Sequence, residues 1–97
     1  MAYQLTVSDR ATLEIAEAYE WYQEQHPGLG FEFLEALDVQ FQAIVQSPQL
    51  YAQIHRGIRR ALLRRFPYGV FYASKREIIS VLAVVRTSRS PRRWPRH

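Results

Sequence analysis

Cysteine is absent from the 97 residues of this chain. Disulfides and thiolate-bound metals are therefore excluded, and the sequence contains neither metal-ligand spacing nor a glycine-rich phosphate loop. No apolar run approaches the roughly 20 residues of a membrane-spanning helix, and the N-terminus lacks the basic and apolar regions of a signal peptide. These absences predict a cytoplasmic protein that uses no metal or cofactor and does not associate with a membrane.

Positive charge is nearly absent from the first half of the chain. Residues 1–48 contain one arginine and eight acidic side chains, a net charge of −7. Residues 49–97 contain twelve basic side chains and one glutamate, a net charge of +11. Such a split is typical of proteins that bind nucleic acid or an acidic protein segment. The alternative is that the two halves neutralise each other across the fold.

Hydrophobic periodicity divides the chain into six elements. Strands are indicated by alternation or by continuous β-branched and aromatic runs, and helices by apolar residues that recur at spacings of three and four. Proline and glycine mark the helix ends. The expected elements are a strand at 3–7, a helix ending at 26–28, a helix ending at 47–48, and strands at 58–65, 68–72 and 78–85.

This order predicts a single α+β domain over residues 1–97. The two helices should form a hairpin on one face of one sheet, and the last three strands should form an antiparallel meander. The nearly all-apolar run 78–85 is expected at the centre of the sheet. If its side chains alternate strictly, one face carries Ile79, Val81, Ala83 and Val85, and the other carries Ile78, Ser80, Leu82 and Val84. The helix residues expected to cover one of these faces are Ile15, Tyr22, Leu37 and Phe41.

In order, spacing and length, the chain resembles toxins of the RelE/ParE superfamily, also called plasmid stabilisation proteins. The resemblance spans nearly the whole chain and rests on Ala11, Leu13, Ile15, Tyr19, Pro27, Gly30, Phe33, Leu34, Pro48, Ile58, Arg59, Arg60, residues 65–72, the apolar strand, Arg89, Ser90, Pro91, Trp94 and Arg96. It implies a bacterial growth-inhibiting toxin that is neutralised by a cognate antitoxin in an oligomeric complex. RelE-like toxins cleave mRNA on the ribosome, whereas ParE-like toxins inhibit DNA gyrase.

The resemblance to RelE-like nucleases implies a cationic cluster on the sheet that stabilises the phosphate transition state without a metal, together with a proton donor near the C-terminus. The cationic candidates, if the chain is a nuclease, are Arg60, Arg64, Arg86 and Arg89. Each of these arginines has an alternative role as part of a solvated basic surface. Among the histidines, only His55, next to the basic strand, is retained as a catalytic candidate.

Other positions of the nuclease pattern are not filled. Leu62 and Gly69 occupy positions where the nuclease pattern has cations. Ser88 occupies a third such position if residues are counted strictly along the chain. Trp94 stands at the position of the proton-donating tyrosine, although an indole does not supply that proton. These gaps favour a ParE-like toxin that inhibits a protein such as gyrase. The alternatives are a RelE-like, metal-independent mRNA endonuclease and an inactive toxin that still binds its antitoxin, so enzymatic activity stays open.

The antitoxin is expected to contribute an acidic, amphipathic segment that folds on binding. It should lie in a groove bordered by the helical hairpin and the sheet. Its carboxylates should meet Arg59, Arg60, Arg64 and Arg65. The residues expected to contact the antitoxin or the cellular target are Arg59, Arg65, Tyr68, Tyr72 and Trp94.

Overall fold

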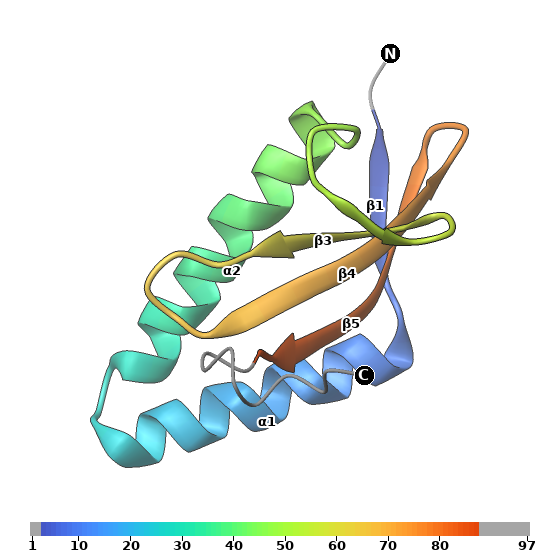
Figure 1. Cartoon of the computed structure of the whole chain (residues 1–97). Helices are drawn as coiled ribbons and strands as arrows, with labels where there is room; N and C mark the ends of the chain where they lie inside the picture. The colour runs from blue at the N-terminus through green and yellow to red at the C-terminus, as the bar shows by residue number, and fades with distance from the viewer. Residues whose placement is uncertain (1–2, 88–97) are drawn as a thin grey trace, which may run out of the picture.

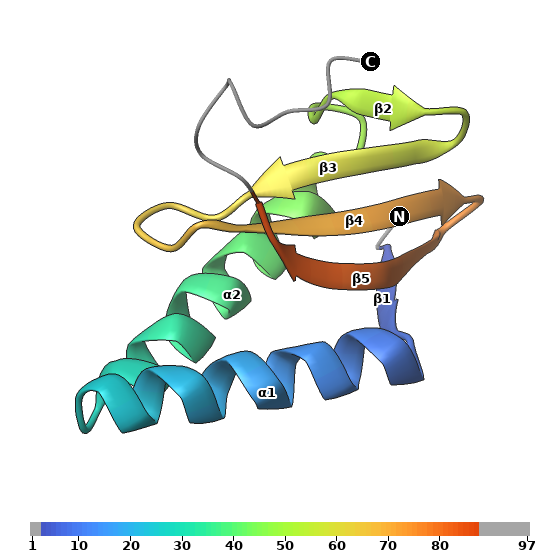
Figure 2. The same ribbon diagram turned by 60° about the horizontal axis from the view of Figure 1, so that its bottom comes forward.

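Two helices and one five-stranded sheet form the fold in the computed structural model, which describes residues 3–87 (Figure 1). The elements are β1 (Gln4–Val7), α1 (Asp9–Gln25), α2 (Leu29–Gln46), β2 (Gln53–His55), β3 (Ile58–Leu62), β4 (Tyr68–Lys75) and β5 (Ile78–Arg86). The strand order is β1-β5-β4-β3-β2, with β1 parallel to β5 and the other pairs antiparallel. Both helices cover the same face of the sheet and diverge from their connecting turn (Figure 2). The predicted α+β fold is confirmed.

The apolar strand β5 lies at the centre of the sheet between β1 and β4, as its sequence predicted. Its register with β4 shifts after Val81, so that Leu82 is an extra residue between the two paired stretches. Beyond this bulge the side chains exchange faces. Val84 therefore joins Ile79 and Val81 in the core, whereas Ala83 is buried outside that core cluster. The strict alternation expected for 78–85 is wrong for this reason.

Side chains of α1 satisfy the edge of β5 where β1 ends. The pairing of β1 with β5 stops opposite Val81. Ser8 caps α1, and its hydroxyl also donates to the carbonyl oxygen of Leu82 at 3.1 Å. Two turns further, a carboxylate oxygen of Glu14 accepts from the Val84 N–H at 2.8 Å. The first turns of α1 are thus fixed to the central strand by polar contacts as well as by burial.

The turn between the helices requires glycine at two positions. Gly28 has φ +93°, a left-handed conformation that side chains other than glycine rarely adopt. At Gly30, an added Cβ would lie 2.6 Å from Cγ of Gln23 and 2.7 Å from Cδ1 of Tyr19. The Gln23 amide oxygen accepts from the N–H groups of both glycines, each at 2.9 Å. This clamp fixes how α2 leaves α1.

The core lies between the helices and the sheet. Tyr22 and Leu37 are buried in it, and Ile15 and Phe41 pack against it, as predicted from the helix periodicity. The short strand β2 was not predicted, because all three of its residues are exposed and show no apolar pattern. Within residues 3–87, neither helix is long and apolar enough to cross a membrane. The same residues contain no acidic, histidine or cysteine cluster that would hold a metal.

Candidate binding surfaces

Alternation along β3 sends two neighbouring arginines to opposite faces of the sheet. Arg59 pairs with Tyr72 and Arg60 pairs with Phe71. Because Tyr72 lies in the core under the helices, Arg59 points to the helix side and Arg60 to the open face, the sheet face turned away from α1 and α2 (Figure 2). A Cβ at Gly69 would lie 3.3 Å from Cε1 of Phe71 and 3.4 Å from Cγ of Arg60. Phe71 and Arg60 therefore meet over Gly69 on the open face.

Arg86 lies on the helix side of the sheet. It pairs with Tyr68, whose ring packs against the core 5.2 Å from the ring of Phe33. The Arg86 guanidinium lies 5.7 Å from the ring centre of Trp21 in α1, a cation–π contact. Tyr68, Trp21 and Arg86 border a hollow of about 380 Å³. Tyr68 thus keeps a partly accessible edge there, and Arg86 faces away from Arg60.

The loop between β3 and β4 carries the next two arginines. Arg65 has φ +70°, and the Phe66 N–H donates to the Arg64 carbonyl at 2.7 Å, which closes a tight turn around Arg65. The Arg65 guanidinium binds a carboxylate oxygen of Glu32 in α2 at 2.7 Å and lies over the Phe66 ring at 5.2 Å. Both charged side chains are more than half exposed, so the pair contributes little stability. The pair links the loop to α2.

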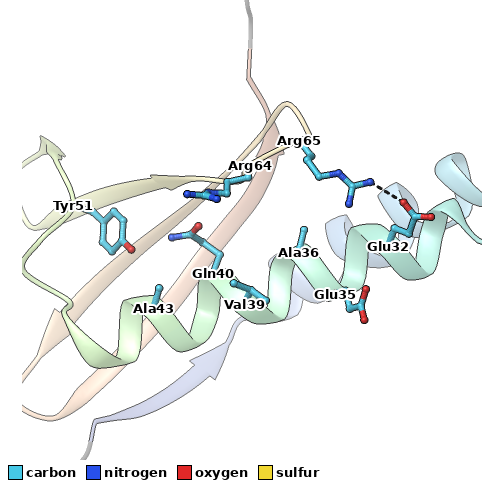
Figure 3. A pocket seen from close by; sticks show the side chains of 9 residues that line it. All are labelled: Glu32, Glu35, Ala36, Val39, Gln40, Ala43, Tyr51, Arg64 and Arg65. Atoms are coloured by element: carbon cyan, nitrogen blue, oxygen red, sulfur yellow. Dashed lines mark hydrogen bonds and ion pairs between the residues drawn. The ribbon is translucent and has the colours of Figure 1, made fainter.

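A groove of about 560 Å³ separates this loop from α2 (Figure 3). We call it the α2 groove; its lining residues are Glu32, Glu35, Ala36, Val39, Gln40, Ala43, Tyr51, Arg64 and Arg65. Arg64 extends over it above Gln40, on the side of Tyr51 (Figure 3). Among residues 3–87, Arg64 forms no ion pair. The groove therefore offers one unneutralised guanidinium over an apolar floor.

Two residues predicted to contact a partner are instead part of the fold. Arg59 donates to the carbonyl oxygen of Tyr51 at 2.6 Å and to the side-chain oxygen of Gln49 at 3.0 Å. Tyr72 is 0% exposed, and its hydroxyl donates to the carbonyl oxygen of Pro48 at 2.7 Å. Burial raises the pKa of Tyr72, although the positive charge of Arg59 acts in the opposite direction. Tyr72 is inaccessible and Arg59 is occupied, so we no longer place either at a binding surface.

The arginines proposed as a nuclease site do not converge within residues 3–87. Arg60 lies on the open face, Arg64 over the α2 groove, and Arg86 against α1. His55 is exposed in β2. Two further candidates, Arg89 and Trp94, lie outside the described residues, as does Ser88.

The sequence led us to expect a groove between the helical hairpin and the sheet, but most residues that line the α2 groove were not predicted. The signal was a second apolar stripe on α2, formed by Ala36, Val39 and Ala43 at spacings of three and four, beside the stripe that enters the core. Its alanines are too weakly hydrophobic to be distinguished from ordinary helix residues. Val39, which is 66% exposed, is the only bulky apolar member of the stripe.

No protein-family model and no curated protein sequence matches the chain. Solved structures do match. A chromosomal ParDE toxin–antitoxin structure from P. aeruginosa has a TM-score of 0.79 at 19% identity and covers 89% of this chain and 97% of that one. The isolated E. coli RelE toxin has a TM-score of 0.70 at 21% identity, covering 92% and 88%. An E. coli RelE arginine mutant bound to a peptide of the antitoxin RelB has a TM-score of 0.65 at 21% identity, covering 95% and 90%. The chain thus has the RelE/ParE fold.

Proposed function

We propose that this chain is the toxin of a bacterial toxin–antitoxin pair and that it acts by binding a protein target, such as DNA gyrase, without cutting RNA. The shared fold supports the toxin assignment. The described arginines of the proposed nuclease site point to different sides of the molecule. This observation supports the ParE-like mode and carries the proposal. We further propose that the chain acts in the cytoplasm and is neutralised by an antitoxin in an oligomeric complex.

Cleavage of RNA requires several groups to converge on one phosphate. A base, a proton donor and the groups that stabilise the transition state must lie within hydrogen-bond reach of the reacting atoms. Arg60 is the only one of the described arginine candidates on the open face, and Gly69 beside it supplies no cation. Arg86 and Arg64 lie on the helix side. A single arginine binds phosphate but does not supply proton transfer, because it stays protonated at neutral pH.

One observation favours the second candidate, a RelE-like endonuclease. The side chains of Arg60 and Phe71 both lie beside Gly69 on the open face, and an aromatic ring together with a cationic side chain is a suitable surface for a nucleotide. Leu62, at the end of the same strand, is 51% exposed and extends the apolar part of this surface. RNA contact at this place does not require catalysis.

The two modes are separated by testing the purified chain against gyrase supercoiling and against ribosome-bound mRNA. We expect inhibition of supercoiling and intact mRNA. Inducing the chain in bacteria should arrest growth, and co-expression of its cognate antitoxin, sought among the reading frames that adjoin the gene, should restore growth. Cleaved mRNA that becomes intact with Arg60→Ala would establish the RelE-like mode. Unimpaired growth on induction of the folded chain would refute the toxin assignment.

A further inference from the structure

The net charge of the chain comes entirely from its last ten residues, which we call the C-terminal segment. Residues 3–87 contain nine basic and nine acidic side chains, whereas residues 88–97 contain four arginines and no acidic side chain. A segment of this composition is repelled by basic surfaces and attracted to acidic ones. Its preferred contact on the chain is therefore set by the charge of the surfaces within its reach.

The described chain ends at Thr87, between two surfaces of opposite charge. The Thr87 N–H donates to the carbonyl oxygen of Pro67 at 2.8 Å, which ties the start of the segment to the loop before β4. Cγ2 of Thr87 and Cγ of Arg60 lie within 3.4 Å of the Cβ position of Gly69, so the nearby part of the open face is basic. On the other side of β5 lies α1 (Figure 1).

The side of α1 next to the end of β5 is acidic and partly apolar. We call it the α1 outer face; its residues are Leu13, Glu17, Glu20, Trp21 and Glu24, which share one exposed side of the helix at spacings of three and four. None of its three glutamates forms an ion pair within residues 3–87. The two apolar residues are large and exposed, Leu13 by 60% and Trp21 by 46%. The face thus offers three unneutralised carboxylates beside apolar surface.

One arginine of this chain already binds at the edge of that face. The guanidinium of Arg86 lies 5.7 Å from the ring centre of Trp21, and Glu17 lines the same hollow of about 380 Å³. Aromatic rings and carboxylates both attract a guanidinium. Ten residues span up to about 33 Å when extended, and α1 is about 25 Å long. The C-terminal segment, which starts next to Arg86, is therefore long enough to reach the whole face.

We infer that the C-terminal segment docks on the α1 outer face of its own chain. Its arginines bind the carboxylates of Glu17, Glu20 and Glu24, and the ring of Trp94 covers the apolar part of the face. The occupant is the chain's own segment because a tether at Thr87 gives it a roughly millimolar effective concentration, which a separate basic protein does not ordinarily match. Exposed ion pairs are individually weak and are screened by salt, so docking is reversible and salt-dependent.

Docking on α1 separates the remaining nuclease candidates from Arg60. Arg89 and Trp94 belong to the C-terminal segment, which this docking keeps on the helix side of the sheet, whereas Arg60 lies on the open face. The docked chain does not bring these groups to one phosphate, as RNA cleavage requires. A toxin that acts by binding a protein does not need that convergence. The docking is thus compatible with the proposed function and does not depend on it.

A zero-length cross-link identifies the surface. Lys75 is the only lysine of the chain, so Arg92→Lys and Arg93→Lys, made one at a time, each place a single new amine in the segment and keep its charge. A carbodiimide joins an amine to a carboxylate in contact with it. Peptide mass spectrometry should find each new amine joined to Glu17, Glu20 or Glu24.

A mixture of 15N-labelled and unlabelled chains shows whether the link lies within one chain, as we expect. Links only to carboxylates away from α1, or no link from either position, would overturn the docking site. Links only between two chains would overturn the assigned occupant, because the segment of a second copy would then fill the face.

Trypsin measures how often the segment is undocked, because it cleaves after arginine in accessible chain. The triple variant Glu17→Gln, Glu20→Gln, Glu24→Gln removes three charges from the α1 outer face. The matched control Glu35→Gln, Asp38→Asn, Glu77→Gln removes three charges from exposed positions elsewhere. All six sites are exposed, so the fold should tolerate both variants, and thermal unfolding checks this.

We expect trypsin to cleave the segment about fivefold faster in the outer-face variant than in the unmodified chain, and within about twofold of it in the control. Rising salt should bring the unmodified chain towards the rate of the outer-face variant, with a free peptide of residues 88–97 correcting for the effect of salt on trypsin itself. Equal rates in the two triple variants would overturn the docking. The proposed function would stand in that case, because growth arrest and supercoiling are measured separately.

Discussion

Removal of the Tyr72 hydroxyl tests whether this residue supports the fold or contacts a partner. Phenylalanine fills the same buried volume, but it leaves the carbonyl oxygen of Pro48, also buried, without its donor at 2.7 Å. Loss of one partner of a buried hydrogen bond costs about 1–3 kcal/mol. In a domain of this size, each kcal/mol lowers the Tm by about 4–8 °C. We therefore expect Tyr72→Phe to unfold at a clearly lower temperature and urea concentration.

The same substitution should change the response to alkaline pH. Burial raises the pKa of Tyr72 above its ordinary value, so the folded chain holds the phenol proton more tightly than the unfolded chain does. The associated stability is fully present below the unfolded pKa of about 10 and is lost as the pH rises through the folded pKa. The free energy of unfolding of the unmodified chain should therefore fall above about pH 10. In Tyr72→Phe this component of the loss should be absent.

Urea denaturation at pH 8 and at intervals above pH 10 measures both effects, with Tyr19→Phe as a control at a partly buried tyrosine. The control should keep the stability of the unmodified chain at pH 8 and its decline at high pH. If Tyr72→Phe were as stable as the unmodified chain yet bound the antitoxin more weakly, the reasoning would be refuted. Tyr72 would then be the contact residue that its sequence context indicated.

Three further substitutions test the fold by urea denaturation. Gly30→Ala should destabilise by about 1–3 kcal/mol, because its methyl group would overlap the side chain of Gln23 at the helix turn. Arg59→Ala should cost about 1–2 kcal/mol, because the segment after α2 loses its donors; equal stability would show that these bonds do not persist in solution. Glu14→Ala should cost about 1–2 kcal/mol by leaving the Val84 N–H without an acceptor, whereas Glu14→Gln, which keeps the acceptor oxygen, should stay close to the unmodified chain.

Local signals were sufficient to predict most of the architecture. The two helices follow from apolar spacing and from the proline and glycine residues that mark their ends, and the central position of β5 follows from its apolar run. The bulge at Leu82 has no local signal, because it arises from the register between β4 and β5. That one extra residue moved Val84 into the core and made strict alternation fail. The strand β2 is likewise defined by its pairing with β3 and not by its own composition.

The binding residues were harder to predict because a sequence shows which residues are charged but not where their side chains point. Arg59 and Arg60 are adjacent and chemically identical, yet one holds the segment after α2 and the other lies on the open face. Arg65 pairs with Glu32, which lies 33 residues away in the sequence. Tyr72 resembled a surface aromatic until its pairing placed it under the helices. Two things decide these roles: the face of the sheet to which a strand residue points, and the distant residues that it contacts. Neither is visible in the local composition.

The charge split between the two halves of the chain is only slightly reduced by contact. Within residues 3–87 there are two ion pairs, and only Arg65–Glu32 joins the halves. Within the described residues, the other basic side chains of the second half form no ion pair, and Arg60, Arg64 and Arg86 lie on surfaces that face different ways. A segment that filled the α2 groove alone would not cover Arg60 on the open face. If the proposed target binds at the open face, a neutralising partner must reach that face as well or exclude the target by its bulk.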